Sequence, residues 1–100
     1  MVINIISLFP AMFEGVFNQS ILRRAVDNEL IELVLTDLRE FGLGSHRVVD
    51  DAPFGGGGGM ILKPEPIASA LEGIPEPGHV ILTTPRGNLF TQDAAIRLSK

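Results

Sequence analysis

The chain has no cysteine, tryptophan or tyrosine, and it lacks both a basic block and a long apolar run. The absence of cysteine excludes disulfides and thiolate metal sites, and it fits a reducing, cytoplasmic setting. No apolar stretch approaches the roughly 18 residues that a membrane-spanning helix requires. The net charge is −4, and the eight basic residues are scattered along the chain. This pattern argues against general nucleic-acid coating, which needs a basic face, but it leaves a local basic site open.

Familiar catalytic and phosphate-binding motifs are also absent. No Lys-Ser or Lys-Thr follows the glycine run, so there is no P-loop, and Met60 interrupts the spacing of a dinucleotide-binding fingerprint. No G-x-S-x-G elbow marks a hydrolase. Neither His46 nor His79 is joined by the further ligands that a metal site needs, so no metal is predicted.

What the chain does contain is enough apolar sequence for a core. Of its 100 residues 45% are hydrophobic, and the mean hydropathy of +0.28 excludes a disordered segment. This length suits one small domain or a piece of a larger one. The last predicted helix meets no glycine or proline stop before Lys100, so we expect the front part of a longer protein. A short helix at a natural C-terminus is the alternative.

Strand-like and helix-like segments alternate along the chain. Apolar and β-branched runs predict strands, and the helices are predicted to begin where proline or a capping residue precedes an apolar stripe. The alternation predicts an α/β fold, with a mostly parallel sheet and flanking helices. The predicted strands are 2–8, 31–35, 60–62 and 80–84, and the predicted helix starts are Pro10, Ser20, Pro64 and Thr91. The stretch 42–59 has no clear period and is predicted to be a loop.

The most unusual feature is the run of five glycines from Gly55 to Gly59. Each glycine loses more backbone freedom on folding than any other residue. Two interpretations stay open. The run is either a flexible hinge or a stretch that lets peptide groups approach a flat or anionic ligand closely.

Polar residues cluster near the glycine run and near the end of the 80–84 strand. His46 suits a phosphate contact, a base or a plain surface residue. Asp50-Asp51 could accept hydrogen bonds from a nucleobase or simply solvate a loop. After the strand, Pro85 and Gly87 predict a tight turn whose exposed peptide groups suit an adenine edge or a ribose. An ordinary strand-to-loop turn is the alternative there.

Three segments together resemble a known family. They are Ile5–Phe13, His46–Met60 and Leu82–Gly87, which lie in the same order and at similar spacing. The chain is similar, through all 100 residues, to the bacterial tRNA (guanine-N1)-methyltransferases of the SPOUT class with a trefoil knot. The resemblance implies that residues 1–100 are the N-terminal portion of a single SPOUT domain. The knot region and the C-terminal domain would lie outside them.

The resemblance implies methyl transfer from S-adenosylmethionine to N1 of the guanine next to the tRNA anticodon, in a cytoplasmic homodimer with shared active sites. The cofactor contacts would come from Leu82, Thr83, Thr84, Pro85, Arg86 and Gly87. The substrate contacts would come from His46, Asp50, Gly58 and Gly59. The family's catalytic aspartate and its helping arginine lie beyond residue 100, so no catalytic residue is expected here. The 100-residue chain alone is expected not to methylate tRNA.

The sequence departs from the family pattern at four positions. The family loop usually has tyrosine where this chain has Phe54, and proline where it has Gly58. Because proline fixes φ, Gly58 predicts a looser loop. The cofactor loop usually reads Ser-Pro-Gln-Gly, whereas this chain has Thr84-Pro85-Arg86-Gly87, and Arg86 would contact a phosphate or face solvent.

Two further hypotheses remain. One is a non-enzymatic nucleotide-binding α/β module, which the acidic net charge and the missing base favour. The other is a purely structural fragment with a disordered glycine loop.

Overall fold

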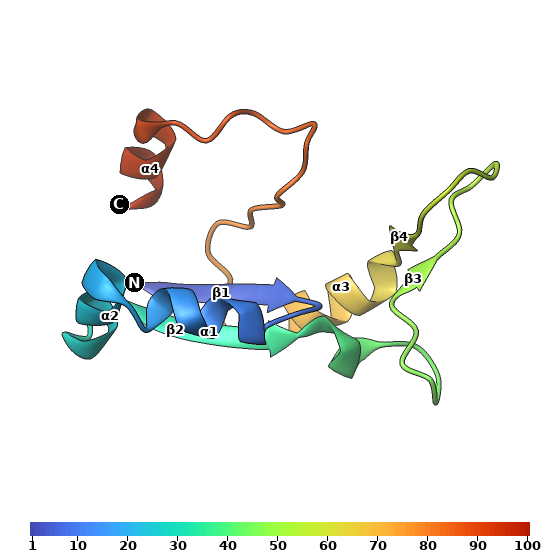
Figure 1. Ribbon diagram of the computed structural model, residues 1–100, viewed down its shortest axis with the longest axis horizontal. Coiled ribbons are helices and arrows are strands. Elements are labelled where there is room, and N and C mark those ends of the chain that lie inside the picture. The colour runs from blue at the N-terminus through green and yellow to red at the C-terminus, as the bar shows by residue number, and fades with distance from the viewer.

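Two parallel strands form the centre of the computed structural model, which describes residues 1–100 (Figure 1). β1 (Val2–Ser7) pairs with β2 (Glu32–Asp37) in a register that sets Val2 opposite Glu32 and Ser7 opposite Asp37. The second strand lies slightly closer to the C-terminus than predicted. The predicted α/β class, with a parallel sheet and helices, is confirmed.

The crossover between these strands contains α1 (Ala11–Phe17) and α2 (Ser20–Asp27). Pro10 is the N-cap of α1, one residue before the predicted first turn. Ser20 was predicted to cap α2, and this prediction is wrong: its φ is +52°, whereas an N-cap residue has extended backbone. Gln19, with φ −124° and ψ 145°, takes that position without a side-chain bond.

The small core lies where the end of β2 meets a later helix. A 3₁₀ helix, η1 (Leu38–Phe41), follows β2 directly and packs against α3 (Pro64–Glu72). Pro64 occupies the first turn of α3, as predicted, because its missing N–H is not needed there. The buried residues are Leu38, Val49, Pro66 and Ala70.

Two short strands form a separate antiparallel hairpin beside this core. β3 (Asp50–Asp51) pairs with β4 (Ile61–Leu62), and the glycine run lies in the loop between them. The predicted short strand at 60–62 is therefore confirmed. The predicted loop at 42–59 contains more structure than expected, because β3 and a bridge between Leu43 and Val48 lie within it.

The predicted strand at Val80–Thr84 is wrong in this structure. These residues belong to no helix or strand, and the parallel sheet stops at two strands. A strand is stabilised by its hydrogen bonds to an adjacent strand, so β-propensity alone does not form one. The side chain of Leu82 consequently remains 79% exposed.

Helix α4 (Gln92–Leu98) ends the chain, and Figure 1 shows it standing away from the sheet. Thr91 caps it as predicted, with its Oγ1 accepting a 3.2 Å hydrogen bond from the Ala94 N–H. The radius of gyration is 15.8 Å, compared with about 13 Å for a compact domain of this length. The chain thus combines one packed region with a long exposed arm. None of its helices is both long and apolar enough to cross a bilayer.

Candidate functional site

The carboxyl ends of the two parallel strands meet, as expected for neighbouring parallel strands. Phe9 follows β1 and Arg39 follows β2, and the Arg39 Cζ lies 5.7 Å from the centre of the Phe9 ring. Each exit is shaped by a side chain. Ser7 Oγ accepts from the Phe9 N–H at 3.0 Å, and Asp37 Oδ1 accepts from the Arg39 N–H at 2.9 Å. The predicted strand 80–84 does not form, so its end does not lie beside the ends of β1 and β2 in the sheet.

The glycine loop presents bare peptide to solvent. Gly55, Gly56, Gly57 and Gly59 have φ values of +79°, +88°, +111° and +82°, which side-chain-bearing residues rarely adopt. A Cβ atom built on any glycine of the run would meet nothing within 4 Å. These four glycines are thus required by backbone conformation and not by close packing within this chain. Such a loop leaves room for a ligand to approach the peptide groups directly.

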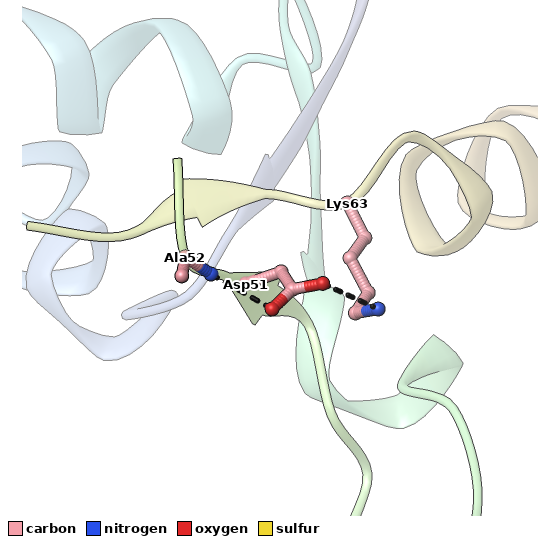
Figure 2. A network of polar contacts seen from close by, with 3 residues as sticks. All are labelled: Asp51, Ala52 and Lys63. Carbon is pink, nitrogen blue, oxygen red and sulfur yellow. Dashed lines mark hydrogen bonds and ion pairs between the residues drawn. The ribbon is translucent and has the colours of Figure 1, made fainter. Parts of the chain in front are cut away.

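The two adjacent aspartates of β3 have different environments. Asp51 Oδ1 accepts from the Ala52 N–H at 2.8 Å, and Asp51 Oδ2 lies 3.4 Å from Lys63 Nζ (Figure 2). The Ala52 N–H, and after it the Lys63 ammonium, lowers the pKa of Asp51 below its usual range. Asp50 is half-buried, and its carboxylate has no hydrogen bond or ion pair in the chain. Successive strand residues face opposite sides, so Asp50 is the carboxylate left to accept from a ligand.

His46 lies in a turn of its own. Backbone bonds of 2.8 and 2.9 Å between Leu43 and Val48 close this turn, and His46 is exposed in it. Gly42 is required here because an added Cβ would lie 2.3 Å from the Arg47 backbone. In Figure 1 this turn and the glycine loop extend in opposite directions from β3. One chain therefore does not gather His46 with Gly58 and Gly59, and their role as a substrate site stays a prediction.

The segment Leu82–Gly87 forms the predicted tight turn. Thr84 O accepts from the Gly87 N–H at 3.3 Å, and Thr84 Oγ1 accepts from the Arg86 N–H at 3.3 Å. Pro85 and Gly87 occupy the positions where a type I turn favours these residues, and Arg86 has no positive φ. All six residues are exposed. The turn offers free peptide groups, and its role in cofactor binding stays a prediction.

The two candidate binding segments do not lie side by side in one chain. Figure 1 shows the glycine loop at one end of the long axis, and the 82–87 segment on the arm that leads to α4. A ligand pair spanning both segments therefore requires either a rearranged arm or a second copy of the chain. No group of three or more histidine, cysteine, aspartate or glutamate side chains is arranged to hold a metal ion.

Two residues with clear roles were missed by sequence reasoning. Lys63 pairs with Asp51 across the hairpin, and Gly42 allows the close approach of Arg47. The sequence would indicate Lys63 only if the antiparallel pairing of 50–51 with 61–62 were also predicted, because that pairing brings the lysine near the aspartates. Gly42 carried no such signal, since its need arises from backbone contact between residues that only the folded turn brings together.

Sequence comparisons give the chain its family. The family model described as tRNA (guanine-1)-methyltransferase TrmD matches residues 1–100. The chain belongs to this methyltransferase family. A tRNA (guanine-N(1)-)-methyltransferase of Geobacter metallireducens is 49% identical over 100 residues, which are 97% of this chain and 41% of that protein. A Dehalococcoides mccartyi protein of the same name is 45% identical, over 100% of this chain and 42% of the relative.

A solved structure agrees with the family assignment. The tRNA (m1G37) methyltransferase of Aquifex aeolicus matches with a TM-score of 0.66 and 35% identity. The match covers 72% of this chain and 32% of that one. The chain thus spans about two fifths of the length of the curated relatives it matches. Membership of a methyltransferase family implies a methyl donor.

Proposed function

We propose that residues 1–100 are the N-terminal portion of a single SPOUT methyltransferase domain, which methylates N1 of the guanine next to the tRNA anticodon. The observation that carries this proposal is the family match over residues 1–100, together with relatives 45–49% identical across nearly all of the chain. The knot region and the C-terminal domain belong to residues beyond Lys100. The cytoplasm, where tRNA is found, is the proposed place of action.

The methyl donor in this proposal is S-adenosylmethionine, which supplies an electrophilic methyl group on sulfur. The turn at Leu82–Gly87 is the proposed contact for it. Support comes from chemistry: the turn is exposed, and the N–H and C=O groups of Leu82 and Thr83 make no backbone hydrogen bond within the chain. Peptide groups of this kind fit the donors and acceptors of an adenine edge and the hydroxyls of a ribose.

The guanine is proposed to lie against the glycine loop, with Gly58 and Gly59 as a wall free of side chains. A base taken out of its stack needs a close-fitting surface, and the space where a Cβ of either glycine would lie is open. Asp50, whose carboxylate has no partner within the chain, is proposed to accept from a guanine N–H. His46 is proposed to contact the neighbouring nucleotide.

Removal of the N1 proton is the chemical step that the chain does not supply. Guanine N1 is protonated at neutral pH, so a base must take that proton before the nitrogen can attack a methyl group. We propose that this base lies beyond Lys100, and that residues 1–100 supply binding contacts within the longer protein but not the base.

A homodimer is part of this proposal. The glycine loop and the 82–87 turn lie apart in one chain (Figure 1), and a second copy could bring one chain's turn to the other's loop. The shared site would then need both copies, so mixing two inactive variants, one altered in each segment, should restore activity to part of the population. Absence of any restored activity would contradict the shared site.

Calorimetric titration tests the function. S-adenosylmethionine is titrated into the 100-residue chain and into a longer protein that continues past Lys100 to the length of the relatives. The proposal predicts binding by the longer protein only. Binding of unrelated mononucleotides by both proteins would favour a non-enzymatic nucleotide-binding module. Binding by neither would favour a structural role.

A further inference from the structure

The ion pair between Asp51 and Lys63 closes the base of the glycine loop (Figure 2). We propose that this pair is a clamp that fixes the direction in which the loop leaves the hairpin, and that Lys63 is a positioning residue for the loop. The clamp itself is a property of the chain alone. Its consequence for RNA binding rests on the proposed function.

The loop has almost nothing else to orient it. Within residues 52–60, one backbone hydrogen bond occurs, from the Gly56 N–H to Pro53 O at 3.3 Å. A Cβ added to any of the five glycines would meet nothing within 4 Å, and Phe54 is fully exposed. The strands that carry the loop are two residues long. The direction of the loop must therefore be set at its base.

The contacts at the base join the entering strand to the leaving one. One carboxylate oxygen of Asp51 accepts from the Ala52 N–H at 2.8 Å, just after β3. The other oxygen lies 3.4 Å from Lys63 Nζ, just after β4. The Lys63 N–H donates to Val49 O at 2.8 Å, which adds a backbone bond beyond the two paired positions. Both ends of the loop are thus held through Asp51 and Lys63.

Lys63 also links the loop to the packed part of the molecule. It directly precedes α3, whose Pro66 is buried, and its backbone partner Val49 is only 3% exposed. The Lys63 side chain is 27% exposed, compared with 70% for Asp51, so the lysine is the better-held partner. A hollow of about 280 Å³ beside the hairpin is lined by both residues and by Phe54. The clamp therefore borders space that a ligand of the loop could use.

The ion pair also makes the two adjacent aspartates differ in charge pairing, because Lys63 contacts Asp51 and not Asp50. Lys63 neutralises Asp51, so an approaching polyanion meets one free carboxylate, that of Asp50, where the sequence shows two. Loss of Lys63 would leave two adjacent negative charges at the loop base. Both loop order and RNA affinity should then fall, and the affinity loss should be larger at low salt.

Hydrogen exchange in the 100-residue chain tests the clamp without any RNA. Loop exchange is measured at the two amides that donate backbone hydrogen bonds in and beside the loop, those of Gly56 and Lys63. Lys63→Gln and Asp51→Asn should each speed this exchange about two- to fivefold, in line with one exposed ion pair. Lys63→Arg should keep the wild-type rate. The Asp51→Asn/Lys63→Gln double variant should be no faster than either single variant, because both remove the same interaction.

A matched control is the exposed pair between Arg23 and Asp27 on α2, which has a 3.5 Å contact and lies in another part of the fold. Arg23→Gln should leave loop exchange unchanged. The urea midpoint should stay the same in every variant, because both pairs are at the surface. Unchanged loop exchange in Lys63→Gln, or equal acceleration in Arg23→Gln, would overturn the clamp.

Kinetics of the longer protein give the second readout. Lys63→Gln should raise KM for tRNA several-fold with kcat nearly constant, and Lys63→Arg should restore KM. A pure fall in kcat, or a KM unchanged at low salt, would overturn the positioning role. If the longer protein binds no tRNA at all, the proposed function fails, while the exchange experiment still decides whether the clamp exists.

Discussion

Two regions of the molecule differ in burial and in the residues they contain. One is the packed region around η1 and α3, and the other is the exposed region formed by the glycine loop and the C-terminal arm. The packed region contains all of the buried residues, namely Leu38, Val49, Pro66 and Ala70. The exposed region contains most of the candidate binding segments, including the glycine run and the Leu82–Gly87 turn. The packed scaffold and the predicted contact surfaces of this chain are therefore separate regions, and few interactions connect them.

The largest expected effect comes from removing one core side chain. Leu38 is 3% exposed and lies at the centre of the core cluster. Leu38→Ala should lower the free energy of unfolding by about 2–5 kcal/mol, because it removes buried surface and leaves a cavity. Urea denaturation measures this change. Leu82→Ala, in the exposed region, should change it by less than about 0.5 kcal/mol. Equal losses in the two variants would break the comparison.

A second test sets two glycines against each other. At Gly42 an added Cβ would lie 2.3 Å from the Arg47 backbone, whereas at Gly58 it would meet nothing within 4 Å. Gly42→Ala should cost about 1–3 kcal/mol of stability, as expected for overpacking. Gly58→Ala should stabilise by up to about 1 kcal/mol, because it restricts the unfolded chain. Thermal denaturation ranks the two, and the reverse ranking would contradict the structure.

A third test stiffens the glycine loop. Gly58 is the one glycine of the run outside the left-handed region, and its N–H donates no backbone hydrogen bond. Gly58→Pro should therefore be tolerated and stabilise by about 0.4–1 kcal/mol. Gly57→Pro should destabilise, because proline cannot adopt the φ of +111° found there. Circular dichroism melts of the two variants check this, and a destabilising Gly58→Pro would show that the loop backbone differs from that described.

The smallest effect concerns the pH dependence of the loop base. The pKa of Asp51 is lowered in the folded chain, first by the Ala52 N–H and then by Lys63. The contribution of the ion pair is thus present above the ordinary aspartate pKa of about 4, and it is lost as pH falls through the lowered folded value. A carbon NMR titration should show the Asp51 midpoint rising in Lys63→Gln yet staying below normal. An unmoved midpoint would mean that the pair does not form.

The sequence predicted the local elements better than their assembly. Proline at the start of α3 and threonine before α4 act through neighbouring atoms, so Pro64 and Thr91 were interpreted correctly. The apolar run at Val80–Thr84 also has high strand propensity, but a strand depends on a partner, and none pairs with it in this structure. The prediction that Ser20 caps α2 was wrong, because Ser20 is the first residue of the helix, with φ +52°, and Gln19 is its N-cap.

In the candidate site, too, the sequence predicted the local features but not those that depend on tertiary pairing. The tight turn at Pro85 follows from proline and glycine alone, and the structure contains it. The different environments of Asp50 and Asp51 depend on which strand pairs with β3, so the sequence could not separate the two carboxylates. The glycine loop and the 82–87 turn can act on one ligand pair only through a rearranged arm or a second copy of the chain. The sequence motif identifies the family but does not provide that arrangement.

Methyl transfer to tRNA is the most direct measurement of the central claim, that residues 1–100 supply binding contacts of the longer protein but not its catalytic base. Labelled S-adenosylmethionine and tRNA are incubated with the longer protein and, separately, with the 100-residue chain, and the product nucleosides are identified by mass spectrometry. The account predicts 1-methylguanosine next to the anticodon with the longer protein and no product with the chain alone. Turnover by the 100-residue chain, or methylation of another atom by the longer protein, would contradict it.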